Sequence, residues 1–136
     1  MARGIEDYSN FAKQDGVVTK KKFGYAVGAG AAVTQLTSRA TGVTINALTG
    51  TITTINTSLA AEASAVFVVT NSTVEIGDVV IVSIRSGAVA LNTDVIVSAT
   101  AAGSFSLTVV NGNVAAGTAE TGAIIVNFAV IKAVNS

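Results

Sequence analysis

The chain has 136 residues, eight basic and eight acidic residues, and neither histidine nor cysteine. A chain of this length buries roughly two-thirds of the surface that it exposes when unfolded, which predicts one compact core. The balanced charge argues against a nucleic-acid partner, because nucleic-acid binding requires a clear basic excess. Without cysteine there is no disulfide framework, so packing or assembly must stabilise the fold.

Residues 1–29 predict an extended N-terminal arm that ends in a glycine-rich hinge. They hold five of the eight basic residues, and their apolar residues follow neither the period of a strand nor that of a helix. We expect this segment to order against another surface, and a flexible terminus is the alternative. The stretch KKKFGYAVGAG combines lysines, aromatic residues and small residues. We expect the arm to bind a partner through Lys20, Lys21, Lys22, Phe23 and Tyr25.

Residues 30–136 predict a single β-domain. Short apolar or alternating runs rich in β-branched residues recur between turn-forming residues, and no convincing helix is present. We expect strands at residues 31–36, 43–47, 50–55, 64–70, 78–86, 93–100, 103–111 and about 123–133. The second and third of these are close enough to form a hairpin. The predicted fold is therefore all-β, a β-sandwich or jelly-roll-like domain of about eight strands that follows the arm.

Several predicted strands are apolar on both faces. In residues 103–111 the inward set is Phe105, Leu107 and Val109, and in the last strand it is Ile124, Val126, Phe128 and Val130. Additional apolar residues lie on the opposite faces of two strands, and extra apolar surface of this kind marks subunit interfaces. The candidates for an oligomer interface are Val79, Ile81, Ile125 and Ile131. The alternative is that loops or the arm of the same chain cover them.

The residue types present exclude several chemistries. Without histidine and cysteine, Ser-His-Asp catalysis, Cys-His catalysis and the common zinc sites are excluded. The acidic residues of the domain lie near predicted loops or strand ends, where carboxylates are normally solvated, and their spacing shows no convergence: Glu62, Glu75, Asp78, Asp94 and Glu120. For Asp78 and Asp94 we expect strand-end capping in place of calcium binding. We expect no catalytic residue, no metal site, no cofactor and no small-molecule substrate.

The glycines of GYAVGAG do not predict a phosphate-binding loop, because they lack the GxGxxG spacing and no helix is predicted after them. The first residues are polar, and the longest apolar run, residues 123–131, is far shorter than the roughly 20 residues of a membrane span. We therefore expect a soluble protein without a secretion signal or a membrane partner.

The chain resembles the β-domain of tailed-bacteriophage virion proteins, particularly head decoration (cement) and head-fibre proteins. The likeness lies in three stretches: GYAVGAGAAVTQLTSRATGVTINALTGTIT (24–53), FVVTNSTVEIGDVVIVSIRSG (67–87) and IIVNFAVIKAV (124–134). It covers most of the chain from Gly24 onward, and no functional residue of the family carries over individually. The resemblance implies a non-enzymatic β-sandwich, usually trimeric, seated on the lattice of the major capsid protein or at the end of a fibre.

Two functions follow as expectations. The first is a capsid decoration protein that is made in the host cytoplasm and binds the major capsid protein at the virion surface. We expect it to be a homo-oligomer, and the resemblance implies a trimer. The second is a head-fibre or tail-fibre adhesin that binds host-surface glycan. Glycan sites usually display exposed aromatic residues, whereas Phe67, Phe105 and Phe128 are each placed on a predicted inner face. This placement favours the first function.

Overall fold

The computed structural model describes residues 20–133, and within that range the chain is all-β with no helix. All eight predicted strands are confirmed, with ends that differ by a few residues. The strands are β1 (Gly30–Thr34), β2 (Val43–Thr44), β3 (Thr49–Thr53), β4 (Ser64–Thr70), β5 (Val79–Ser86), β6 (Thr93–Ala101), β7 (Ser104–Asn111) and β8 (Ile125–Ile131).

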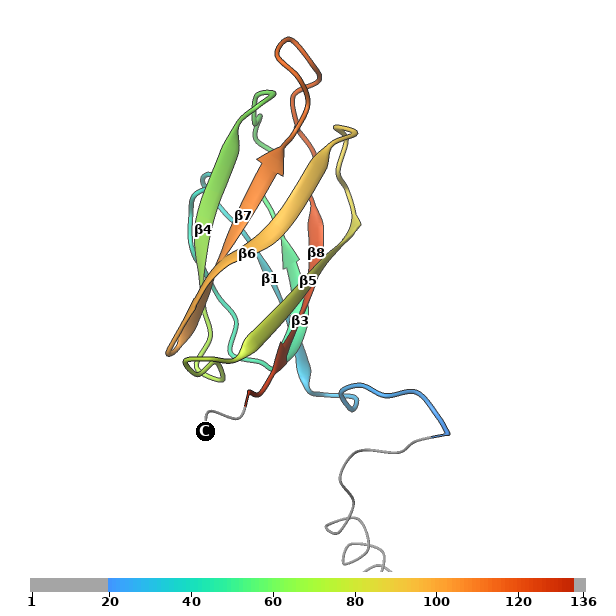
Figure 1. Cartoon of the computed structure of the whole chain (residues 1–136), viewed down its shortest axis with the longest axis vertical. Coiled ribbons are helices and arrows are strands. Elements are labelled where there is room, and N and C mark those ends of the chain that lie inside the picture. Colours follow the sequence, from blue (N-terminus) through green and yellow to red (C-terminus); the bar gives the residue numbers. More distant parts are fainter. Residues whose placement is uncertain (1–19, 134–136) are drawn as a thin grey trace, which may run out of the picture.

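The strands form two mixed sheets of four strands. Sheet A has the order β1-β3-β8-β5, and sheet B has the order β2-β4-β7-β6. β1 runs parallel to β3, and β2 runs parallel to β4, whereas the other pairs are antiparallel. The two sheets lie in a sandwich-like arrangement, and the chain enters β1 at the same end of the molecule at which β8 finishes (Figure 1).

Both sheets contribute to one apolar core, because successive side chains of a strand point to opposite faces. The aromatic rings of Phe105 on β7 and Phe128 on β8 meet across the two sheets, with centroids 5.5 Å apart. The inward sets predicted for the seventh and eighth strands are confirmed. Buried apolar residues of these two sets are Phe105, Leu107, Val109, Ile124, Val126, Phe128 and Val130.

The predicted hairpin between residues 43–47 and 50–55 is wrong. β2 pairs with β4 in sheet B, whereas β3 lies in sheet A between β1 and β8. The chain crosses between the sheets here: the N–H of Ile45 donates to the carbonyl oxygen of Thr70 at 2.9 Å, and the carbonyl of Leu48 accepts from Val130 N–H at 2.7 Å. Closeness in sequence did not decide this pairing, because β2 pairs with β4, and β3 pairs with β1 and β8.

Gly50 on β3 allows the backbone of the edge strand β1 to lie close to that of β3. A Cβ atom at this position would approach the carbonyl oxygen of Ala31 to 2.4 Å, a distance that side chains essentially never adopt. Glycine is therefore required for the close approach of the two backbones. Because residues 20–29 run directly into β1, this contact also fixes the position at which they meet the sandwich.

Candidate interaction surface

Residues 20–29, which we call the lead segment, contain all five predicted arm residues. They form neither strand nor helix, and all of them except Ala29 are exposed. Phe23 is 81% exposed, an unusual state for a large aromatic side chain. The ring of Tyr25 is held in place, because its hydroxyl donates a hydrogen bond to the carbonyl oxygen of Val130 on β8. The rest of the predicted arm, residues 1–19, lies outside the described residues.

Three of the four predicted interface residues gather near the lead segment, on the outer face of sheet A. Val79 on β5 is the register partner of Ile131 on β8, and Ile81 is the partner of Ala129. The side chains of Val79, Ile81 and Ile131 are each about half exposed. Ile125 lies at the other end of β8 and is only partly exposed.

The lead segment and this apolar face form one continuous surface. A groove of about 290 Å³ separates them, lined by Phe23, Gly24, Tyr25, Ala129, Ile131 and Lys132. We call the lead surface the set Phe23, Tyr25, Ala129 and Ile131, which all line this groove. Residues predicted to bind a partner through the arm therefore lie beside residues predicted for the oligomer interface. Lys20, Lys21 and Lys22 directly precede Phe23 in the chain.

Lys132, which also lines the groove, forms ion pairs with Asp78 and Glu75, and we call these three residues the clamp. Its Nζ lies 2.6 Å from Asp78 Oδ2 and 3.1 Å from Glu75 Oε2, and it also donates to the carbonyl of Thr73. Asp78 further accepts from the backbone N–H groups of Glu75 and Ala133. The Lys132 ammonium and the Glu75 N–H lower the pKa of Asp78, and Asp78 raises the pKa of Lys132. The clamp ties the end of β8 to the β4–β5 loop.

The expectation that the acidic residues are solvated is wrong for Asp78 and Glu120, which are both buried. Capping by Asp78 and Asp94 agrees with the structure, since each carboxylate accepts a hydrogen bond from backbone N–H groups near a strand end. Glu120 is fully buried, and its carboxylate accepts from Gly122 N–H at 2.7 Å and from Thr93 Oγ1. The N–H groups of Val89 and Ala90 also donate to it.

The hydrogen bonds to the Glu120 carboxylate favour its ionised form. Burial acts to raise its pKa, but the hydrogen bonds from Thr93 and the three backbone N–H groups together hold that pKa below its ordinary value. Arg39 is buried beside it and donates to the carbonyl oxygens of Thr57, Glu120 and Gly122. Burial lowers the pKa of Arg39, an effect that the charge of Glu120 opposes. The pair fixes loops at the end of the sandwich opposite the lead segment.

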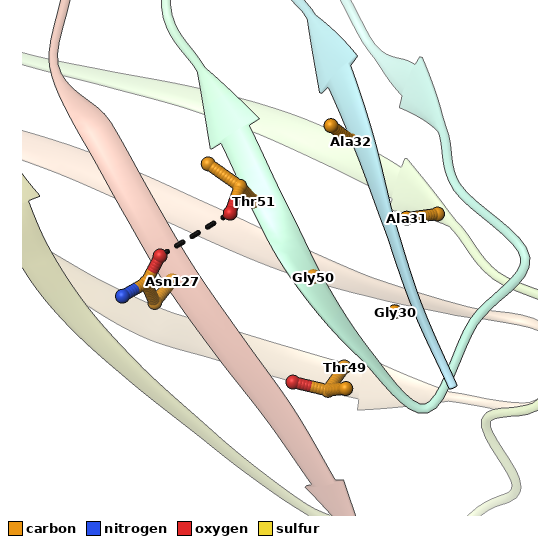
Figure 2. Close-up of a pocket in the computed structure, with 7 residues that line it drawn as sticks. All are labelled: Gly30, Ala31, Ala32, Thr49, Gly50, Thr51 and Asn127. Atoms are coloured by element: carbon orange, nitrogen blue, oxygen red, sulfur yellow. Dashed lines mark hydrogen bonds between the residues drawn. The ribbon is translucent and has the colours of Figure 1, made fainter. Parts of the chain in front are cut away.

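A second depression lies over β1, β3 and β8 and measures about 590 Å³ (Figure 2). Its lining residues carry no ionisable side chain: Gly30, Ala31, Ala32, Thr49, Gly50, Thr51 and Asn127. The hydroxyl of Thr49 is hydrogen-bonded to the carbonyl of Phe128, and that of Thr51 to Asn127 Oδ1. The residues that line the depression therefore include no side chain that could act as an acid or a base.

The outer face of sheet B carries an exposed apolar strip whose residues were not among the predicted interface residues. Val66 on β4 and Ile96 on β6 are both register partners of Thr108 on β7, so the three residues form a row across the sheet. Val66, Val68 and Ile96 are each about half exposed. The signal was present in the run AVFVV, whose alternate valines had to point outward once Phe67 pointed inward.

Within residues 20–133, no group of three or more acidic residues is arranged so that it could hold a metal ion. The same residues include no helix that is long and apolar enough to span a membrane. Comparison of the chain with protein-family models, with curated proteins and with solved structures finds no match.

Proposed function

We propose that this chain is a non-enzymatic capsid decoration protein of a tailed-bacteriophage virion, which attaches to the lattice of the major capsid protein and stabilises the head. The sequence resemblance supplies the class of protein. The lead surface is the observation that carries the attachment role, because it joins exposed aromatic residues to an exposed apolar sheet face. Contiguous exposed apolar surface of this kind marks sites of protein contact.

The lysines and the aromatic residues have different roles in the proposed attachment. Exposed ion pairs contribute only about 0–1 kcal/mol each to binding. Lys20, Lys21 and Lys22 therefore mainly orient the chain as it approaches the capsid. Burial of Phe23 and Tyr25 against a partner supplies the larger part of the affinity, as aromatic residues do at the centres of interfaces. Many copies on one lattice add to the strength of attachment.

The same proposal includes the type of sandwich, the role of the arm and the assembly of the chain. The sandwich is related to the jelly-roll domains of virion proteins, residues 1–29 act as an extended arm, and the chain assembles as a trimer on the outer surface of the head. Val79, Ile81 and Ile125, which do not line the groove, contribute to the contact between copies, and Ile131 lies where this contact borders the lead surface. The protein is made in the host cytoplasm before the virion assembles.

The alternative role of a glycan-binding fibre module finds less support. Phe67, Phe105 and Phe128 are buried, with exposed fractions of 2%, 1% and 2%. Among residues 20–133, the exposed aromatic residues are therefore Phe23 and Tyr25, both in the lead segment. The sandwich itself presents no aromatic platform on which a sugar ring could stack.

Adding the purified chain back to heads that lack it tests the proposed function. We expect the full chain to co-sediment with such heads and to raise the temperature at which they release DNA. A chain with Phe23→Ala and Tyr25→Ala should bind less, whereas Val66→Ala on the opposite sheet serves as the matched control. Failure of the full chain to bind heads, together with binding to host cells, would favour the fibre module.

A further inference from the structure

The sequence contains one Asn-Gly pair, formed by Asn111, the last residue of β7, and Gly112. A glycine after asparagine favours deamidation, because its nitrogen has no neighbouring Cβ atom to shield it and its backbone adopts the required angles freely. In this reaction the glycine nitrogen attacks Cγ of asparagine, so that an N–Cγ bond forms and the Cγ–Nδ2 bond breaks. The amide proton of glycine leaves with Nδ2 as ammonia, and water then opens the cyclic imide to aspartate or isoaspartate.

The side chain of Asn111 is fully buried, and both polar atoms of its amide are hydrogen-bonded. Nδ2 donates to the carbonyl oxygens of Leu59 and Thr118, each at 3.0 Å. Oδ1 accepts from the backbone N–H of Asn113 at 3.2 Å. Ring closure would move Cγ and break these hydrogen bonds, so the folded structure opposes the reaction.

The nitrogen that would attack, that of Gly112, is also hydrogen-bonded. Its N–H donates to the carbonyl oxygen of Asn92 at 2.9 Å. The main chain just before it is held as well, because the N–H of Asn111 donates to the carbonyl oxygen of Ala63 at 2.9 Å and Asn111 is the register partner of Thr93 on β6. The Gly112 nitrogen is therefore not free to approach Cγ of Asn111 in the native structure.

The loops that hold Asn111 lie at the end of the sandwich opposite the lead segment, where β7 finishes (Figure 1). Leu59, which accepts from Asn111, is bridged to Glu120, since each backbone N–H donates to the carbonyl oxygen of the other residue, at 2.9 and 2.8 Å. The buried carboxylate of Glu120 in turn accepts from Ala90 and Thr93. Opening of these loops would free the side chain of Asn111.

Deamidation of Asn111 would leave a chain that cannot rebuild this site. In the aspartate product an anionic oxygen replaces Nδ2 and faces the carbonyl oxygens of Leu59 and Thr118, which lose the hydrogen bonds from Nδ2. A buried carboxylate that faces hydrogen-bond acceptors is strongly disfavoured. The isoaspartate product adds a methylene group to the main chain and disturbs the register of β7. Both products therefore oppose refolding.

We propose that Asn111 is a deamidation site that folding protects and unfolding exposes. A chain that stays unfolded acquires aspartate or isoaspartate at this position and loses its ability to return to the native structure. The site thereby limits how long an unfolded chain remains competent to fold. This limit is a property of the fold and is independent of the capsid role.

Incubation of the full chain at slightly alkaline pH, folded in buffer and unfolded in guanidinium chloride, tests the proposal. Peptide mapping by mass spectrometry measures the fraction of Asn111 that has become aspartate or isoaspartate. We expect the unfolded chain to react at least about tenfold faster, because the folded chain reacts only through its open fraction. Equal rates in the two states, or no reaction at Asn111 in guanidinium chloride, overturn the proposal.

Two other asparagines serve as references within the same samples. Asn71 precedes Ser72 and Asn92 precedes Thr93, so the attacking nitrogen next to each is shielded by a side chain. Both should react more slowly than Asn111 in guanidinium chloride. If they react as fast, the assignment of Asn111 is wrong.

Gly112→Ala separates the chemistry of the site from the fold. A Cβ atom at this position would lie 3.1 Å from the carbonyl oxygen of Asn92, a contact that a shift of a few tenths of an ångström relieves. Reaction at Asn111 should be several times slower in the unfolded variant than in the unfolded wild type. After long incubation in denaturant the variant should refold with the yield of a fresh sample, whereas the wild type should refold with a reduced yield. Equal losses of refolding yield in the two chains would contradict the proposed limit.

Discussion

The hydroxyl of Tyr25 donates a hydrogen bond to the carbonyl oxygen of Val130, 105 residues later in the chain. This contact joins the lead segment to the last strand of sheet A and places an aromatic ring over the apolar end of β8. Lys132, two residues beyond Val130, is held by the clamp with Asp78 and Glu75. One end of the sandwich therefore combines a fixed framework with exposed aromatic and basic residues.

Tyr25→Phe removes this hydrogen bond and keeps the ring. Because one hydrogen bond contributes about 0.5–1.5 kcal/mol, we expect a small loss of global stability. The larger effect should be local, as greater backbone mobility of residues 23–26 in nuclear magnetic resonance relaxation measurements. Order parameters unchanged from those of the wild type would show that the hydroxyl does not anchor the lead segment.

Ile81→Glu should weaken self-association, since it places a charge on the predicted contact between copies. Val68→Glu is the matched control on the other sheet, because the two side chains are similarly exposed, at 52% and 47%. Sedimentation equilibrium over a range of concentrations measures the effect. If Val68→Glu dissociates the oligomer and Ile81→Glu does not, the contact between copies lies on sheet B.

Phe105→Ala should destabilise the fold by about 3–5 kcal/mol, the usual cost of truncating a buried phenylalanine. The cost arises because Phe105 meets Phe128 between the sheets and is almost fully buried. Urea unfolding provides the measurement. Phe23→Ala, in contrast, should change stability by no more than about 0.5 kcal/mol, because its side chain is exposed. A large loss in that variant would mean that Phe23 packs within its own chain.

Stability should fall in acid. The folded state holds the pKa values of Asp78 and Glu120 below their ordinary values. The unfolded chain consequently binds protons first, so stability is fully present above pH ~5 and is lost as the pH falls through ~4 and below. Urea midpoints measured from pH ~7 to pH ~2 report this slope. A midpoint that stays constant through this range would contradict the linkage.

Glu120→Gln isolates one part of that acid dependence. It removes the charge from a buried hydrogen-bonded carboxylate beside Arg39 and should cost on the order of 3 kcal/mol at neutral pH. The loss of stability in acid should also become smaller than in the wild type. Glu62→Gln, at an exposed position, provides the control and should leave the unfolding curve unchanged.

The sequence was sufficient for elements whose signal is local. Residues 64–70 were predicted with the bounds that β4 has, because the continuous apolar run AVFVV ends at the turn-forming residues NST. The pairing of β2 was missed, since two residues form a parallel pair with a distant strand. Burial of Glu120 could not be predicted either, because three of its donors, Val89, Ala90 and Thr93, lie about 30 residues earlier in the chain. The meeting of Tyr25 with β8 likewise depends on the whole fold.

Electron cryo-microscopy of heads reconstituted with the purified chain would show directly whether the chain decorates the capsid. We expect density for the sandwich on the outside of the capsid shell, with the lead segment and the end of β8 turned toward the major capsid protein. Heads reconstituted with the Phe23→Ala, Tyr25→Ala variant should show reduced occupancy at the same positions. Full-length chain that leaves the shell bare, or that contacts it through the loop network around Glu120, would contradict the account.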